Sequence, residues 1–141
     1  MRFAWPADIL VEDQGITVTF PDVPGAITWG KTRAEAMERA SDALISIISA
    51  MIEDGEPIPV ASAAAGRPMI SVAPLDAVKI ALHIAMLKKG ISNVELGRLM
   101  GLDEKAVRRL RDPLQRSHIE KLDVALHLLG KRIEVSVLED A

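Results

Sequence analysis

The apolar residues between positions 92 and 110 recur at helical spacing and are interrupted once, at Gly101. Ser92 begins a capping-box sequence that can open a first helix, and Asp103 can cap a second one. Gly97 is small where two such helices would cross, and Gly101 can adopt the left-handed conformation of a tight turn. This pattern predicts two short helices joined by a turn, as in a helix-turn-helix. An ordinary αα-hairpin with a solvated basic face is the alternative interpretation.

The second helix of this pair carries cations just inside its N-terminus. Such a helix end suits the major groove of DNA, where some side chains reach base edges while others contact phosphates. We therefore predict base contacts from Lys105, Arg108 and Arg109. Contacts nearer the phosphates are predicted from Ser92, Asn93 and Arg98.

The first 72 residues have the pattern of strands around one helix. Their β-prone runs are residues 3–11, 16–20, 26–29 and 69–72. Within the first run, Pro6 cannot donate to a ladder, so we expect this strand to lie at an edge or to be bulged there. A long amphipathic run begins at Thr32 and ends at Gly55, which predicts a helix between the third and fourth strands. This order predicts a two-layer β-β-β-α-β domain.

The rest of the chain is predicted to be helical, apart from its end. Residues 75–89 and 119–129 are expected to form helices on either side of the helix-turn-helix. The predicted fold class is therefore α+β. An N-terminal domain of residues 1–72 precedes an all-α helix-turn-helix domain of residues 75–141, which ends in a β-strand.

That closing strand is residues 132–138, where apolar side chains alternate with polar ones. A lone strand would leave its backbone unpaired, so we expect it to pair with its copy in a second chain across a two-fold axis. This predicts a homodimer or a higher even oligomer. A frayed tail, or pairing with the first domain's sheet, is the alternative. The predicted dimerisation residues are Ile133, Val135 and Val137.

The composition changes this picture mainly through charge. The 141 residues carry a net charge of −3, but residues 1–72 hold five basic and ten acidic residues, a balance of −5. Residues 73–141 have a balance of +2, with the basic excess concentrated between positions 79 and 121. An acidic half joined to a basic half indicates two partners of opposite charge.

Other features restrict the class of protein. There is no cysteine, which excludes disulfides and thiolate metal sites. No membrane-spanning stretch or signal peptide is recognisable, so a cytoplasmic protein without a membrane partner is expected. His83, His118 and His127 lie far apart, none has a metal-ligand neighbour at i+4, and no phosphate-binding loop or nucleophile elbow is present. We therefore predict no catalysis, metal or cofactor, and we expect both tryptophans in the core.

Two stretches of sequence are specific enough to indicate a family. The first comprises Pro21-Asp22-Val23-Pro24-Gly25, then Gly30, Thr32 and Glu35-Ala36, then Asp54-Gly55-Glu56-Pro57-Ile58-Pro59. With these motifs, residues 16–59 resemble the N-terminal domain of HicB antitoxins. Residues 92–130 resemble the Xre/Cro-type helix-turn-helix that many HicB proteins carry behind that domain. Gly97 departs from the usual alanine of such motifs, at an expected cost of about 1 kcal/mol in helix stability.

The resemblance implies a function that spacing alone does not indicate. HicB proteins bind and block HicA, a small ribonuclease toxin, and their C-terminal domain typically binds the operator of their own operon. The N-terminal domain is similar to a reduced ribonuclease H fold, generally without activity. The toxin-binding residues expected here are Asp22, Val23, Glu35, Glu38 and Asp42. The alternatives are a ligand-responsive helix-turn-helix transcription factor without a toxin partner, and a residual ribonuclease H-like nuclease.

Overall fold

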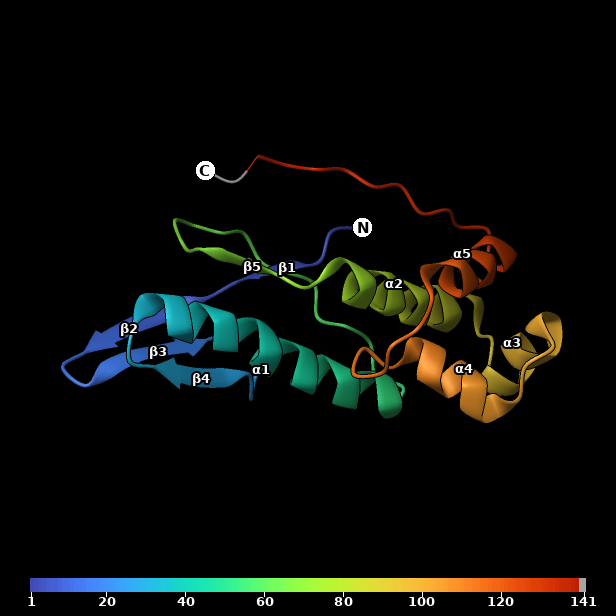
Figure 1. The fold of residues 1–141 in the computed structure, drawn as a ribbon, viewed down its shortest axis with the longest axis horizontal. Helices are drawn as coiled ribbons and strands as arrows, with labels where there is room; N and C mark the ends of the chain where they lie inside the picture. Colours follow the sequence, from blue (N-terminus) through green and yellow to red (C-terminus); the bar gives the residue numbers. More distant parts are fainter. Residues whose placement is uncertain (140–141) are drawn as a thin grey trace.

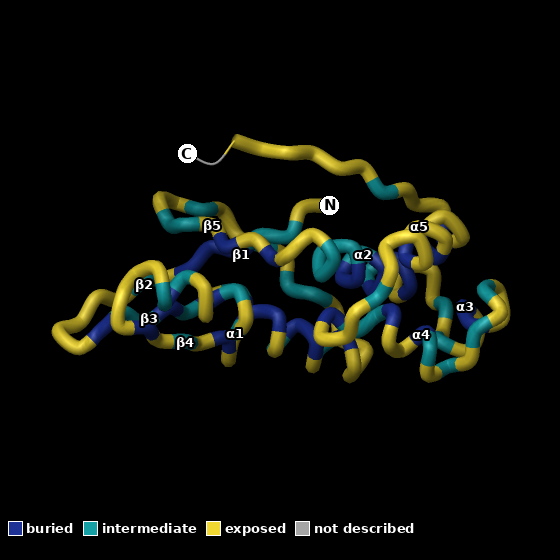
Figure 2. Tube along the Cα trace, in the orientation of Figure 1, coloured by how far each residue is buried: buried dark blue, intermediate teal, exposed yellow. Residues whose placement is uncertain are grey.

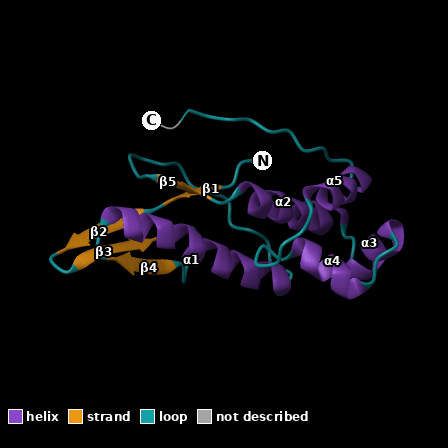
Figure 3. Cartoon of the chain, viewed as in Figure 1, coloured by secondary structure: helices purple, strands orange, loops and turns teal. Residues whose placement is uncertain are grey.

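The computed structural model describes residues 1–139 and confirms an α+β fold. Figure 1 shows a small sheet at one end of the molecule, a group of four helices at the other, and α1 extending between them. The elements are β1 (Ala4–Pro6), β2 (Asp8–Glu12), β3 (Gly15–Thr19), β4 (Ile27–Gly30), α1 (Arg33–Glu53), β5 (Met69–Ser71), α2 (Pro74–Lys89), α3 (Asn93–Met100), α4 (Glu104–Arg111) and α5 (Ile119–Leu128). Figure 3 shows that all strands lie in the N-terminal part.

The sheet β2-β3-β4 is an antiparallel meander covered on one face by α1. Its side chains alternate as the sequence predicts, because Val18 and Phe20 are buried. Trp29 lies on the opposite face, opposite Thr17, and is 40% exposed, so the expectation that it lies in the core is wrong. Its indole lies over Gly15, where a Cβ atom would come within 2.4 Å of the ring.

The predicted first strand is divided in two at Ala7. β1 pairs with β5 in a separate antiparallel ladder, while β2 begins the three-stranded sheet. The break follows from Pro6, which has no N–H to donate. The N–H of Ala7 instead donates to the carbonyl of Pro68, at 3.0 Å. The fourth strand is therefore present as predicted, as the partner of β1.

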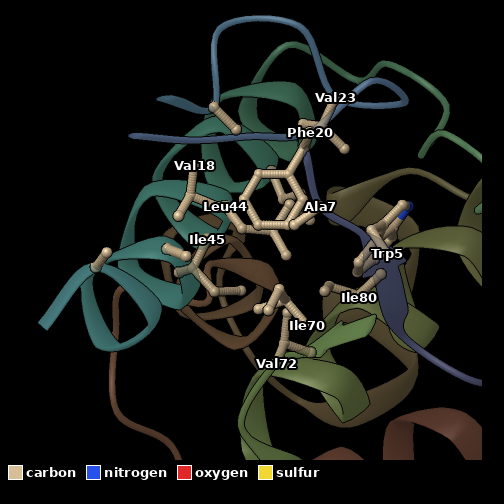
Figure 4. Close-up of a cluster of buried hydrophobic side chains, with 14 of the residues drawn as sticks. Trp5, Ala7, Val18, Phe20, Val23, Leu44, Ile45, Ile70, Val72 and Ile80 are labelled. Atoms are coloured by element: carbon tan, nitrogen blue, oxygen red, sulfur yellow. The ribbon is translucent and has the colours of Figure 1, made fainter. Parts of the chain in front are cut away.

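Two separate clusters of buried apolar side chains stabilise the fold, as the burial pattern in Figure 2 indicates. The first lies between α1 and the strands, and the second lies among α2, α3, α4 and α5. Helix α2 contributes to both, because Ile80 packs in the first cluster beside Trp5 and Ile70 (Figure 4), while Leu82 and Met86 pack in the second. A domain boundary near residues 72–75 stays a prediction, and α2 belongs to both parts.

The closing strand predicted for residues 132–138 is absent from this single chain. The segment leaves α5 as an extended tail with no ladder partner, which corrects the strand prediction for an isolated protomer (Figure 1). Ile133 is half-buried against the second cluster, whereas Val135 and Val137 are 79% and 93% exposed. No helix within residues 1–139 combines the length and the apolar character needed to cross a membrane.

Candidate functional site

The helices α3 and α4 form the turn that the sequence predicts. The hydroxyl of Ser92 accepts from the N–H of Glu95 at 3.1 Å, and the Glu95 carboxylate accepts in return from the N–H of Ser92. Gly101 ends α3 with a φ of +70°, in the left-handed region that favours glycine. Asp103 then caps α4 by accepting from the N–H of Ala106 at 2.8 Å. Both capping predictions are confirmed.

Gly97 has a role that the helix-propensity argument did not capture. A Cβ atom at this position would lie 2.5 Å from the carbonyl oxygen of Leu102. The same two residues are joined by a hydrogen bond from the Leu102 N–H to the Gly97 carbonyl, at 2.8 Å. Glycine is therefore required here by the close approach of the turn, and the alanine usual in similar motifs does not fit without a shift of the backbone.

Three cations predicted to read bases all lie exposed on α4, but they differ in their surroundings. Arg108 donates to the Glu104 carboxylate at 2.8 Å. Hydrogen bonds from Asn93 and Arg108 lower the pKa of Glu104, so this carboxylate is ionised. Lys105 and Arg109 form no ion pair within residues 1–139. They are the cations best placed to meet a polyanion.

Of the residues predicted near phosphates, Asn93 has a different role. Its amide nitrogen donates to Glu104 at 3.3 Å, and its amide oxygen accepts from Arg111 at 2.6 Å. Because both ends of the side chain are occupied, Asn93 joins α3 to α4, and we correct its assignment as a phosphate contact. Ser92 and Arg98 are exposed on α3.

A buried histidine connects this helix pair to the end of α1. The Nε2 atom of His83 lies 2.7 Å from the carbonyl oxygen of Glu56, and its Nδ1 atom accepts from the guanidinium of Arg111. Since arginine can only donate, this arrangement places the imidazole proton on Nε2. Burial lowers the pKa of His83 most, and the Arg111 charge lowers it further, against the opposing effect of the Glu56 carbonyl.

The lowered pKa makes stability depend on pH. The unfolded chain takes up a proton at His83 near pH 6.5, whereas the folded protein takes it up only at lower pH. We therefore expect the free energy of unfolding to fall as the pH decreases below 6.5. Urea denaturation between pH 5 and pH 7.5 measures this slope. His83→Gln should flatten it, and an unchanged slope in that variant would contradict the assignment to His83.

Two of the residues expected to contact a toxin are engaged inside the N-terminal part. Val23 is fully buried in the first core, so its side chain is not available to a partner, and this assignment is corrected (Figure 4). The Asp22 carboxylate accepts from the N–H and the hydroxyl of Ser62, each at 2.9 Å. Asp22 therefore anchors a loop 40 residues further along the chain, where the sequence suggested a local backbone bond.

The other three acids lie on α1. Glu35 completes the start of the helix and pairs with Arg39 at 2.7 Å, while Glu38 and Asp42 are exposed. Residues at the intervening positions pack on the sheet, so these exposed acids face away from it. They form an acidic face on the helix layer of the N-terminal part.

The opposite layer has an apolar surface that the sequence analysis missed. Leu10, Ile27 and Trp29 all lie on the outer face of the sheet and are between 40% and 62% exposed. Exposed apolar side chains gathered on one face are typical of interaction sites. Strand alternation was a usable signal, because it placed these residues opposite the buried Val18.

Other candidate chemistry is sparse. A crevice of about 620 Å³ lies between the end of α1 and the α3–α4 pair, lined mainly by charged and polar side chains that include Glu53, Arg108 and Asp112. Within residues 1–139, no three histidines or carboxylates lie together as metal ligands. The two-metal arrangement of a ribonuclease H-like nuclease therefore has no counterpart in the described chain.

Comparison with known proteins decides the family. The family model described as "HicB_like antitoxin of bacterial toxin-antitoxin system" matches residues 5–81, just over half of the chain. The chain belongs to the HicB antitoxin family. Antitoxin HicB 2 of Photorhabdus laumondii is 36% identical over 134 residues, which cover 93% of this chain and 94% of that protein. Antitoxin HicB of Escherichia coli K12 is 35% identical over 122 residues, covering 86% and 88%. Antitoxin HicB of Pseudomonas fluorescens is 31% identical over 139 residues, covering 97% and 95%.

This HicB-family antitoxin neutralises a toxin and is not an enzyme. The similarity to whole HicB proteins extends over α3, α4 and α5, so the C-terminal helices are part of the relationship. Sequence reasoning missed Lys79 and His83, which are fully buried on α2. Their spacing was a usable signal, because the two residues lie one helical turn apart within an otherwise apolar run.

Proposed function

We propose that this antitoxin neutralises a HicA-type ribonuclease toxin through its N-terminal domain and represses its own operon by binding DNA through α4. It would act in the cytoplasm, as a homodimer or a higher even oligomer. The observation that carries the DNA-binding part is the exposed pair Lys105 and Arg109 on a capped second helix, behind a turn fixed by Gly97 and Gly101. Cations presented in this way fit the major groove.

The DNA-binding proposal is tested with the region upstream of the protein's own gene. Lys105→Ala combined with Arg109→Ala should weaken operator binding by about 1–3 kcal/mol per base contact, or roughly tenfold to a hundredfold for each. Fluorescence anisotropy with labelled operator and with unrelated DNA measures both affinity and specificity.

The matched control removes the same charge elsewhere. Lys31 and Arg33 are exposed at the start of α1, in the N-terminal part. Lys31→Ala combined with Arg33→Ala should leave the operator affinity within about twofold, since non-specific attraction depends on charge near the phosphates. Equal losses in the two double variants would contradict base contacts from α4.

The toxin-binding proposal rests on charge. A ribonuclease that binds RNA presents a positive surface, and the −5 balance of residues 1–72 is complementary to it. The exposed acids Glu38 and Asp42 supply part of this charge on the helix face. We propose that the toxin approaches this face and the neighbouring turn of residues 21–25. Complementary charge should speed association and make it sensitive to salt.

Charge reversal tests which face is used. Glu38→Lys combined with Asp42→Lys should slow association with the co-encoded toxin and reduce rescue of growth on co-expression. Glu120→Lys combined with Asp123→Lys makes the same change on exposed positions of α5 and should have no effect. If only Trp29→Ala on the outer sheet face weakens the complex, the toxin binds the sheet instead. DNA binding without any toxin binding would favour a plain transcription factor.

A further inference from the structure

We propose that Lys79 is a positioning residue for DNA recognition, because its buried ammonium group holds the C-terminal end of α4 in place. This inference rests on the DNA-binding function proposed above. It concerns a residue of α2 that lies outside the helix-turn-helix and does not itself contact DNA.

The environment of Lys79 is unusual for a lysine. The residue is 0% exposed, although lysine is almost never fully buried unless its charge is satisfied. Its Nζ atom donates to three backbone carbonyls, those of Arg109 at 2.9 Å, Asp112 at 3.0 Å and Gln115 at 2.8 Å. A fourth acceptor is the hydroxyl of Ser117, at 2.8 Å. Four acceptors within 3.0 Å exceed the three hydrogens of the ammonium group, so this charge is fully coordinated.

The acceptors show what the charge stabilises. The last carbonyls of a helix have no partner within it, and the helix dipole makes that end negative. The Arg109 carbonyl lies in the last turn of α4, and that of Asp112 lies at its C-cap. Pro113 follows directly and cannot continue the helix. A helix of eight residues has little stability of its own, so its end depends on such external contacts.

The clamp is anchored to parts of the protein that lie outside the helix-turn-helix. Ile80, next to Lys79 on α2, packs in the first core. The carboxylate of Asp112 accepts from the hydroxyl of Ser49 on α1, at 2.7 Å, and from the N–H of Leu114. The beginning of α4 is fixed by the Asp103 cap, while its end is fixed by α1 and α2. Lys79 therefore sets the direction of α4 relative to the rest of the protein.

This position has a specific consequence for DNA binding. Hydrogen bonds to base edges need side chains placed within a few tenths of an ångström, whereas attraction to phosphates tolerates displacement. Loss of the clamp should therefore reduce affinity for the operator much more than affinity for unrelated DNA. General unfolding would instead weaken both, together with toxin binding.

The test compares Lys79→Met with Lys89→Met. Both remove one positive charge from α2, but Lys89 is exposed near the end of the helix. Lys79→Met should weaken operator binding at least tenfold, leave the affinity for unrelated DNA within about twofold, and speed amide hydrogen exchange over residues 108–117. Lys89→Met should preserve the ratio of the two affinities and the exchange rates. A folded Lys79→Met protein that keeps the wild-type ratio would overturn the proposal.

A second variant serves if Lys79→Met does not fold. Ser117→Ala removes one of the four acceptors and no charge, and it should weaken operator binding by about two- to fivefold with faster exchange over residues 112–117. Unchanged operator affinity and unchanged exchange in this variant would overturn the clamp. If the wild-type protein shows no preference for its operator, the proposed function fails, and the hydrogen-exchange comparison still decides whether Lys79 positions α4.

Discussion

Replacing Gly97 with alanine should lower the free energy of unfolding by about 1–3 kcal/mol, although alanine is the better helix former. The added Cβ atom would lie 2.5 Å from the Leu102 carbonyl oxygen and 3.4 Å from a methyl group of Val107. The first neighbour is backbone, which cannot rotate away as a flexible side chain can. The turn between α3 and α4 would have to open, and the 2.8 Å hydrogen bond between Gly97 and Leu102 would be strained.

Urea denaturation of the full chain measures this loss. Arg98→Ala is the matched control, because Arg98 is the next residue along α3 and is exposed. It should change stability by no more than about 0.5 kcal/mol. A Gly97→Ala protein that is more stable than the wild type, by the roughly 1 kcal/mol expected from helix propensity alone, would show that the turn has room for a side chain.

The sequence predicted the elements well where local signals decide them. Caps at Ser92 and Asp103, the turn glycine Gly101 and the alternation through Val18 are all found as expected. Each of these signals acts over a few residues, so it can be recognised in one stretch of chain. The break at Ala7 is similar, because it follows from the missing N–H of Pro6.

The predictions that failed depend on contacts between distant segments. Val23 is buried and Trp29 is exposed because of how the sheet meets α1, which periodicity alone does not determine. Ser49 and Asp112 are 63 positions apart and yet share a hydrogen bond. Lys79 looked like a surface charge because its four acceptors come from a segment about 30 to 38 residues away. No local pattern in the sequence indicates such partners.

Val135→Asp should convert the protein to a monomer and weaken operator binding by about 10²- to 10⁴-fold, if the tail of residues 132–138 pairs with its copy in a second chain. Val135 is 79% exposed in the single chain and belongs to an alternating series with Ile133 and Val137, which a strand would place on one face. In an antiparallel pair formed across a two-fold axis, an introduced carboxylate would lie near its own copy and repel it. The monomer would contact one half-site only.

Ser136→Asp is the matched control, because it introduces the same charge on the opposite face of the tail. It should leave the oligomeric state unchanged. Light scattering reports the mass of each variant, and anisotropy with an inverted-repeat operator reports the affinity. Removal of residues 131–141 should give the same result as Val135→Asp. A truncated protein that remains dimeric would show that the subunits associate through another surface, and the exposed face of α5, with Val124 and Leu128, would then be the surface to change.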